Sequence, residues 1–246
     1  MVLEVQLLVD PLLIVSPHLD DGVLSCGQLM AGRPETTLLA CFAGAPKPVQ
    51  STPYDLASGF PDSTTAVKLR RREDALACKV LQAQPVHLPL LDGQYLLDQE
   101  AGRDWRLQQV QAQVLAVWHH LSQPDIICPL GLVHPDHQLV AEACQGLVDV
   151  VRKAGRQVVI YEELPARVLW PEAVPRALHR WGVAHWKVGA DVSQPQLAPI
   201  FYGTGPIELK LEALSCYSSQ LPLLAALGDG LGPHCWQVPE RYWGPA

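Results

Sequence analysis

The sequence predicts an α/β protein: a single Rossmann-like, three-layer domain in which a mostly parallel sheet carries helices on both faces. Two observations carry this prediction. Short apolar runs of strand length alternate with stretches of helical periodicity from residue 12 to residue 160. The first run, Leu12 to Ser16, is continuously apolar and bounded by prolines, which is typical of a central strand buried on both faces.

Each element is placed by its apolar period and its end signals. The expected strands are Leu12 to Ser16, Thr37 to Ala43, Val86 to Leu91, Asp125 to Leu130 and Gln157 to Tyr161. The expected helices are Gly22 to Ala31, Thr65 to Leu81, Trp105 to Leu121 and Asp136 to Lys153. Residues 45–63 are rich in Pro, Ser, Gly and Asp and predict a long loop, a length that is uncommon unless the loop serves a site.

The alternation weakens after residue 165. Residues 170–199 show no dominant period, although His185 to Val188 could form a strand. Ile207 to Tyr217 has helical character, and residues 233–246 are irregular and aromatic. Because no linker-like composition separates this part from the rest, we expect one domain over residues 1–246. Its core would be residues 10–165, completed by residues 166–246.

Composition excludes several classes of partner. The 246 residues are 48% hydrophobic and 17% charged, as in compact folded proteins. The net charge of −7 disfavours nucleic acid and anionic membranes and suits a small-molecule substrate. There is no basic signal region and no apolar run of about 20 residues, so no membrane insertion is expected. Seven singly scattered cysteines indicate reduced thiols and a cytoplasmic location, and a homo-oligomer stays open.

Two polar clusters follow apolar runs and precede helical patterns. The first is Ser16-Pro17-His18-Leu19-Asp20-Asp21-Gly22, and the second is His134-Pro135-Asp136-His137. Ligands of parallel sheets bind where strands end, so we expect the two clusters to meet. Histidine and aspartate suit a catalytic zinc with three protein ligands, and a further carboxylate could take a proton from water. Histidines at helix starts are also often caps, and the pattern alone leaves both interpretations open.

The two clusters together resemble the signatures of the LmbE/PIG-L family of zinc-dependent N-deacetylases, a His-Pro-Asp-Asp-Glu motif and a His-x-Asp-His motif. Further segments are similar to family elements and extend the resemblance over most of the chain. They are Arg70 to Asp74, Tyr161-Glu162-Glu163-Leu164-Pro165 and Tyr217-Ser218-Ser219-Gln220.

The resemblance implies roles for the first cluster and its partner. By motif position, His18, Asp21 and His137 would bind Zn²⁺, and Asp20 would be the general base acting on a zinc-activated water. Zinc is the default for such a ligand set, although sites with nitrogen and oxygen ligands also accept iron, cobalt or nickel.

The resemblance also implies supporting residues. His134 would protonate the leaving amine or stabilise the tetrahedral intermediate, and Asp136 would orient a histidine. A carboxylate in the first turn of a helix explains Asp136 equally well. Arg70 or Arg71, together with Asp92, would contact sugar hydroxyls, whereas the alternative for the arginines is ion pairing on their own helix.

Three positions depart from the family pattern. Leu19 replaces a proline, Gly22 replaces the motif's glutamate, and Leu132 stands where some relatives carry a tyrosine that helps to polarise the carbonyl. None of the three removes an implied ligand. They leave open whether another group polarises the carbonyl or the substrate differs.

The leading functional hypothesis is a hydrolase that removes an N-acetyl group from an N-acetylglucosamine-type amino sugar. One alternative is a metal-dependent amidase that acts on a non-sugar acylated amine. Another is a non-catalytic Rossmann-like nucleotide-binding protein, which is disfavoured because carboxylates stand where glycines should cradle phosphate. His119-His120 is expected to be an exposed or capping pair, and Trp170, Trp181 and Trp186 are expected to pack, so neither set is assigned to the site.

Overall fold

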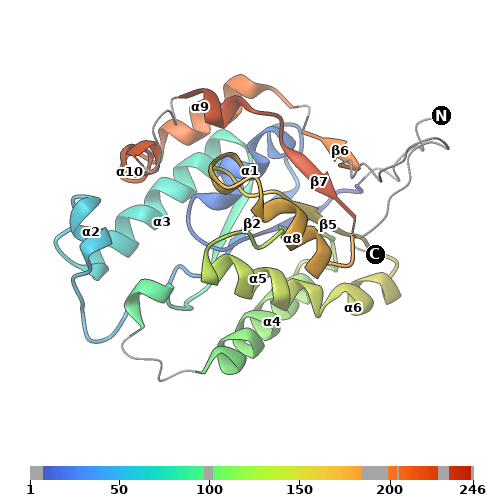
Figure 1. Cartoon of the computed structure of the whole chain (residues 1–246), viewed down its shortest axis with the longest axis horizontal. Coiled ribbons are helices and arrows are strands. Elements are labelled where there is room, and N and C mark those ends of the chain that lie inside the picture. Colours follow the sequence, from blue (N-terminus) through green and yellow to red (C-terminus); the bar gives the residue numbers. More distant parts are fainter. Residues whose placement is uncertain (1–7, 97–101, 184–198, 204, 227–232, 245–246) are drawn as a thin grey trace.

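The computed structural model describes residues 8–96, 102–183, 199–203, 205–226 and 233–244. It confirms the predicted fold class, because a seven-stranded sheet of order β3-β2-β1-β4-β5-β7-β6 has helices on both faces (Figure 1). The first five strands in chain order run parallel, and β7 is antiparallel to β5 and β6. The strands are β1 (Leu12–Ser16), β2 (Thr36–Ala40), β3 (Gln84–His87), β4 (Asp125–Pro129), β5 (Val158–Tyr161), β6 (Phe201–Tyr202) and β7 (Arg241–Trp243).

Two hydrophobic layers hold the helices on the sheet. Leu12 and Ile14 of β1 point into one layer and Leu13 and Val15 into the other, because successive side chains of a strand alternate between faces. The first layer is covered by α1 (Asp21–Met30), α3 (Ser63–Val80) and α9 (Ile207–Ser215). The second is covered by α4 (Arg103–His120), α5 (Pro135–Gln145), α6 (Val148–Lys153) and α8 (Ala173–Arg180).

The remaining helical elements are short. They are α2 (Pro53–Ala57), α7 (Ala166–Leu169), α10 (Leu221–Ala226) and the 3-10 turns η1 (Gly93–Tyr95) and η2 (Pro233–Gln237). No helix within the described ranges has the length and apolarity needed to cross a membrane.

The position of β1 in the sheet determines where a ligand can bind. β1 lies between β2 and β4, with Leu12 paired to Thr36 on one side and Asp125 on the other. After β1 the chain enters α1 on one face, and after β4 it enters α5 on the opposite face. The chain therefore diverges at the carboxyl ends of β1 and β4, which is where open α/β sheets form their binding crevice.

The structure corrects several expected elements. The loop expected over residues 45–63 contains α2, whose start is capped by Thr52 accepting from the backbone N–H of Asp55. The helix expected from Asp136 to Lys153 is two helices, with Gly146 as the C-cap of the first. Residues 173–180 form the amphipathic helix α8, which lies within the 170–199 stretch where no dominant period was expected. The segment 185–188 lies outside the described residues.

The C-terminal tail, expected to be irregular, adds β7 to the sheet and is anchored by a buried ion pair. Glu240 accepts hydrogen bonds from Lys210 Nζ at 2.8 Å and from the Tyr242 hydroxyl at 2.8 Å. It also accepts from the backbone N–H groups of Gln28 and Leu29 in α1. Since Lys210 is fully buried, this carboxylate joins α1, α9 and the tail inside the first hydrophobic layer.

Lys210→Met should lower the free energy of unfolding by about 3–5 kcal/mol, because it leaves the Glu240 carboxylate buried without its counter-charge. Urea unfolding followed by circular dichroism measures the change. The control is Asp10→Asn, which removes the half-exposed partner of Arg33 and should cost at most about 1 kcal/mol. Equal stability of the Lys210→Met variant and the wild type would contradict the anchoring role.

Candidate active site

The two polar clusters meet at the carboxyl ends of β1 and β4. Asp21 opens α1, and its Oδ2 atom lies 3.1 Å from His18 Nδ1 and 3.2 Å from His137 Nε2. The same oxygen accepts the backbone N–H of His18 at 2.9 Å, which fixes the turn between β1 and α1. His137 lies in the first turn of α5. All three side chains are buried, so residues more than 100 positions apart converge on one carboxylate.

Each histidine has a second buried carboxylate behind it. His18 Nε2 lies 3.2 Å from Asp136 Oδ2, and His137 Nδ1 lies 3.5 Å from Glu163 Oε1. When the outer nitrogens carry the proton, the inner nitrogens present lone pairs toward Asp21. Carboxylates that accept a hydrogen bond from the outer nitrogen of a metal-binding histidine commonly orient its ring in this way.

These residues fit a divalent transition metal ion. Two ligand atoms at 2.0–2.1 Å from a tetrahedral metal lie about 3.3 Å apart, close to the separation of Asp21 Oδ2 from each histidine. Among the described residues, ligand atoms of His18, His134 and His137 also lie within 4.8 Å of one another, as do those of His18, Asp92 and Asp136. Burial disfavours the protonated forms of both histidines. The surrounding carboxylates outweigh it, holding the pKa of His18 well above its usual value and raising the pKa of His137 to about 9. The same negative field would favour a bound cation in place of those protons.

Glu163 is a site residue whose role the sequence analysis did not identify. It follows β5, is fully buried, and its Oε1 accepts the backbone N–H groups of Gly131 (2.8 Å) and Leu132 (2.9 Å). Gly131 has a φ of +79°, a conformation that favours glycine. Glu163 thereby fixes the turn between β4 and α5 and faces His137. Its only sequence signal was its place in the Tyr161 to Pro165 segment.

Asp20 stands beside the histidine cluster. Its Oδ1 lies 3.9 Å from Arg70 Nη2, and both side chains are buried. Burial and the neighbouring Asp21 carboxylate raise the pKa of Asp20 to about 6, against the opposing effect of Arg70. Asp20 is thus a carboxylate in a buried, charged setting next to the candidate metal ligands.

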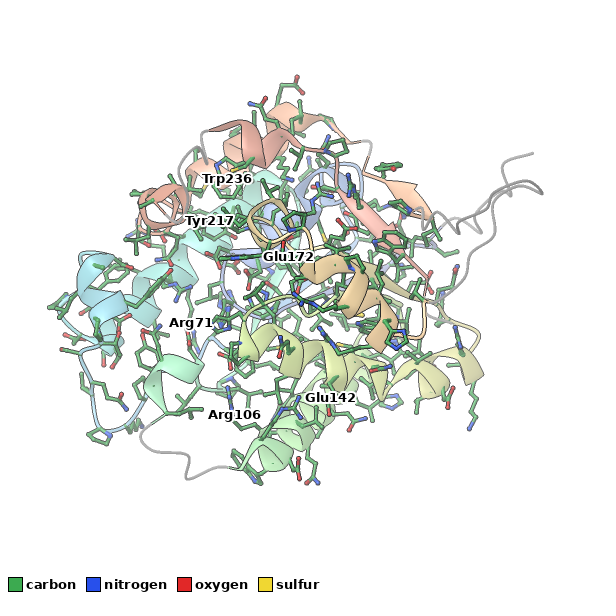
Figure 2. The ribbon with its side chains drawn as sticks, in the orientation of Figure 1. Arg71, Arg106, Glu142, Glu172, Tyr217 and Trp236 are labelled. Carbon is green, nitrogen blue, oxygen red and sulfur yellow. The ribbon has the colours of Figure 1, made fainter. Side chains whose placement is uncertain are left out.

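Asp136 and His134 occupy the start of α5. Asp136 accepts from the backbone N–H of Gly93 and from Arg106 Nη2, each at 2.8 Å (Arg106 is labelled in Figure 2). Burial alone would raise the pKa of Asp136, but these donors and His18 hold it well below its usual range. His134 is exposed and caps α5, its Nδ1 accepting the backbone N–H of Asp136. Asp136 therefore lies in the first turn of a helix and also contacts a histidine, so both interpretations considered for it from the sequence apply.

A scan against family models matches residues 13–148 to the family described as PIG-L, GlcNAc-PI de-N-acetylase. The chain belongs to the PIG-L family. Among proteins with curated descriptions, none matches this sequence significantly.

Solved structures share the PIG-L fold of this chain. A deacetylase complex from the teicoplanin biosynthesis pathway has 24% identity and a TM-score of 0.71, covering 94% of this chain and 96% of that one. The zinc-inhibited form of teicoplanin deacetylase has 23% identity and a TM-score of 0.69, with the same coverage. A conserved protein from Thermus thermophilus has 20% identity and a TM-score of 0.54, covering 96% and 94%.

In this PIG-L protein a pocket of about 1090 Å³ opens over the cluster. Arg70 and Asp92 line it, and Arg70 Nη1 lies 3.8 Å from Asp92 Oδ2. Arg71, labelled in Figure 2, is not among the lining residues, and its Nε donates to the carbonyl of Ala43 at 2.7 Å. Trp170, which the sequence analysis left out of the site, also lines the pocket.

The other residues left out of the site lie away from the pocket or cannot be placed. Trp181 is buried and donates to the carbonyl of Leu130. His119 and His120 end α4, as expected, and neither lines the pocket. Trp186 is outside the described residues.

The three departures from the family pattern are accommodated by local packing. A Cβ at Gly22 would lie 2.4 Å from Leu38 Cδ1, so Leu38 occupies space that a side chain at this position would need. Leu19 is buried in a small cluster with alanines of the neighbouring strand end. Leu132 is buried in the second hydrophobic layer, and the following residue, Val133, lines the pocket instead.

Gly22→Ala should destabilise the protein by about 1–3 kcal/mol, because the added methyl group overpacks against Leu38. In the double variant Gly22→Ala/Leu38→Ala, the loss should be smaller than the sum of the single losses by at least about 0.5 kcal/mol. Chemical unfolding of all three variants measures this coupling.

Gly32→Ala is the matched control, since nothing lies within 4 Å of a Cβ at that position. Additive losses in the double variant would show that Leu38 does not exclude a side chain from position 22.

Proposed function

We propose that this protein is a metal-dependent hydrolase that removes the N-acetyl group from an amino-sugar derivative of the N-acetylglucosamine type. The observation that carries the proposal is the convergence of His18, Asp21 and His137 beside the carboxylate of Asp20. Membership of a family described as GlcNAc-PI de-N-acetylase supports it, as do structural neighbours described as teicoplanin deacetylases. The substrate would be a small molecule and the setting cytoplasmic.

His18, Asp21 and His137 would hold the metal ion, with zinc as the expected metal and iron, cobalt or nickel as alternatives. A bound cation would polarise the amide carbonyl and lower the pKa of water. Asp136 behind His18 and Glu163 behind His137 would keep the two rings oriented.

Proton transfer and stabilisation of the intermediate fall to two residues of this chain. Asp20 would take the proton from the water that attacks the acetyl carbonyl and pass it to the leaving amine. His134 Nδ1 accepts a backbone N–H, so the neutral ring carries its proton on Nε2 and would donate a hydrogen bond to the oxyanion of the tetrahedral intermediate. Water and the amide are thereby converted into acetate and a free amino sugar.

Substrate recognition would fall to Arg70 and Asp92. Both line the pocket and are buried, and Arg70 Nε has no hydrogen-bond partner within the described residues. A sugar hydroxyl that bridges the guanidinium and the Asp92 carboxylate would satisfy these groups. Arg71 would act indirectly, by holding the strand end at Ala43.

Asp20→Asn should lower kcat for acetate release from an N-acetylglucosamine conjugate on the order of 10²–10⁴-fold, because the amide cannot accept the proton. Metal content, measured by mass spectrometry, should stay at the wild-type level, since Asp20 is not assigned as a ligand. The control is Asp149→Asn, an exposed carboxylate on α6 that should leave kcat unchanged. Undiminished turnover of the Asp20→Asn variant would overturn the assigned base.

Glu163→Gln should weaken Zn²⁺ binding about ten- to a hundredfold, because the neutral amide no longer supports His137. Competition with a chromogenic chelator measures the affinity without any substrate. Glu172→Gln changes an exposed glutamate and serves as the control (Figure 2). An unchanged Zn²⁺ affinity would show that Glu163 does not support His137 as a metal ligand.

A further inference from the structure

The pocket above the cluster has two chemically different sides. Its floor is formed by charged groups at the ends of β1 and β4, with Arg70 and Asp92 beside them. Apolar and aromatic residues line the rest of the pocket and form its apolar side. They are Tyr54, Leu96, Val133, Pro135, Leu164, Pro165, Ala166, Trp170 and Leu224. At about 1090 Å³ the pocket exceeds the roughly 300–1,000 Å³ typical of sites for drug-sized ligands, so a monosaccharide alone would not fill it.

The apolar side comes partly from outside the segment that matches the family model. That match ends at residue 148, whereas Leu164, Trp170 and Leu224 follow it. The charged floor lies within the matched segment, as does Tyr54. Trp170 therefore comes from the part of this chain beyond the match.

The two aromatic residues of the apolar side are partly exposed, and the Tyr54 ring is held in place. Trp170 is 39% exposed and Tyr54 is 38% exposed. The Tyr54 hydroxyl donates to Oε1 of the buried Gln220 at 2.8 Å, which anchors α2 beside the start of α10. The Arg70 guanidinium lies 5.9 Å from the centre of the Tyr54 ring, so Tyr54 joins the apolar side to the charged floor. Aromatic rings bind a flat apolar group well, and the fixed Tyr54 ring does so at little entropic cost.

We propose that Trp170 and Tyr54 form a subsite for an apolar, aromatic aglycone carried by the N-acetyl amino sugar. This inference rests on the proposed function, which places the acetamide at the charged floor, next to Asp20. The far end of the substrate then lies against the apolar side. The subsite selects substrates by their aglycone, while the floor carries out the hydrolysis.

The test compares phenyl and methyl glycosides in two assays. The first assay is acetate release from phenyl and methyl N-acetyl-β-D-glucosaminide. The second is calorimetric binding of the deacetylated products, phenyl and methyl β-D-glucosaminide, to the full-length metal-loaded protein. The expected result is a preference for phenyl over methyl of about tenfold in both kcat/KM and Kd. Trp170→Ala should reduce this preference to about twofold or less, and Trp170→Phe should keep most of it.

The control variant is Trp105→Ala, which removes a 55% exposed tryptophan of α4 that does not line the pocket and should leave the preference unchanged. Equal binding of the two glucosaminides by the wild type, or a phenyl preference that survives Trp170→Ala, would overturn the subsite. A preference that instead follows the length of the acyl chain, tested with N-butanoyl substrates, would also overturn it. Loss of acetate release from every substrate would count against the proposed function, and the binding assay would still decide the subsite.

Discussion

The site depends on one carboxylate held between two imidazoles. Asp21 reaches His18 within its own turn and His137 across the sheet, and all three side chains are buried. Burying ionisable groups is costly unless opposite charges compensate them, so this cluster is stable only when protons or a cation sit among its carboxylates. The adjacency of β1 and β4 makes the arrangement possible, because it places two helix starts on opposite faces of one crevice.

Two further carboxylates lie behind the histidines and need the same compensation of buried charge. Asp136 lies behind His18 and is itself held by Gly93 and Arg106, and Glu163 lies behind His137. Strand β5 thus contributes to the site although its own side chains do not line the pocket, since Glu163 follows directly on its end. Several carboxylates therefore surround the two histidines, and the arginines that pair with these carboxylates offset part of their negative charge.

The sequence predicted the parts that depend on local patterns. Leu12 to Ser16 is a continuous apolar run and forms β1 with the expected bounds, and the two polar clusters meet at the sheet end as expected. Elements decided by distant contacts were missed. The three residues of β7 are too short to show a strand period, and they join the sheet next to β5. Trp170 looked like a packing residue because nothing local to an irregular segment indicates that it faces a pocket.

We infer that the Asp21 cluster holds a divalent metal ion. The most direct measurement is anomalous X-ray diffraction from crystals of the zinc-loaded protein, recorded on both sides of the zinc absorption edge. The account predicts one strong anomalous peak about 2.0–2.2 Å from His18, Asp21 and His137 together. A peak elsewhere in the pocket, or no peak in protein saturated with zinc, would contradict it.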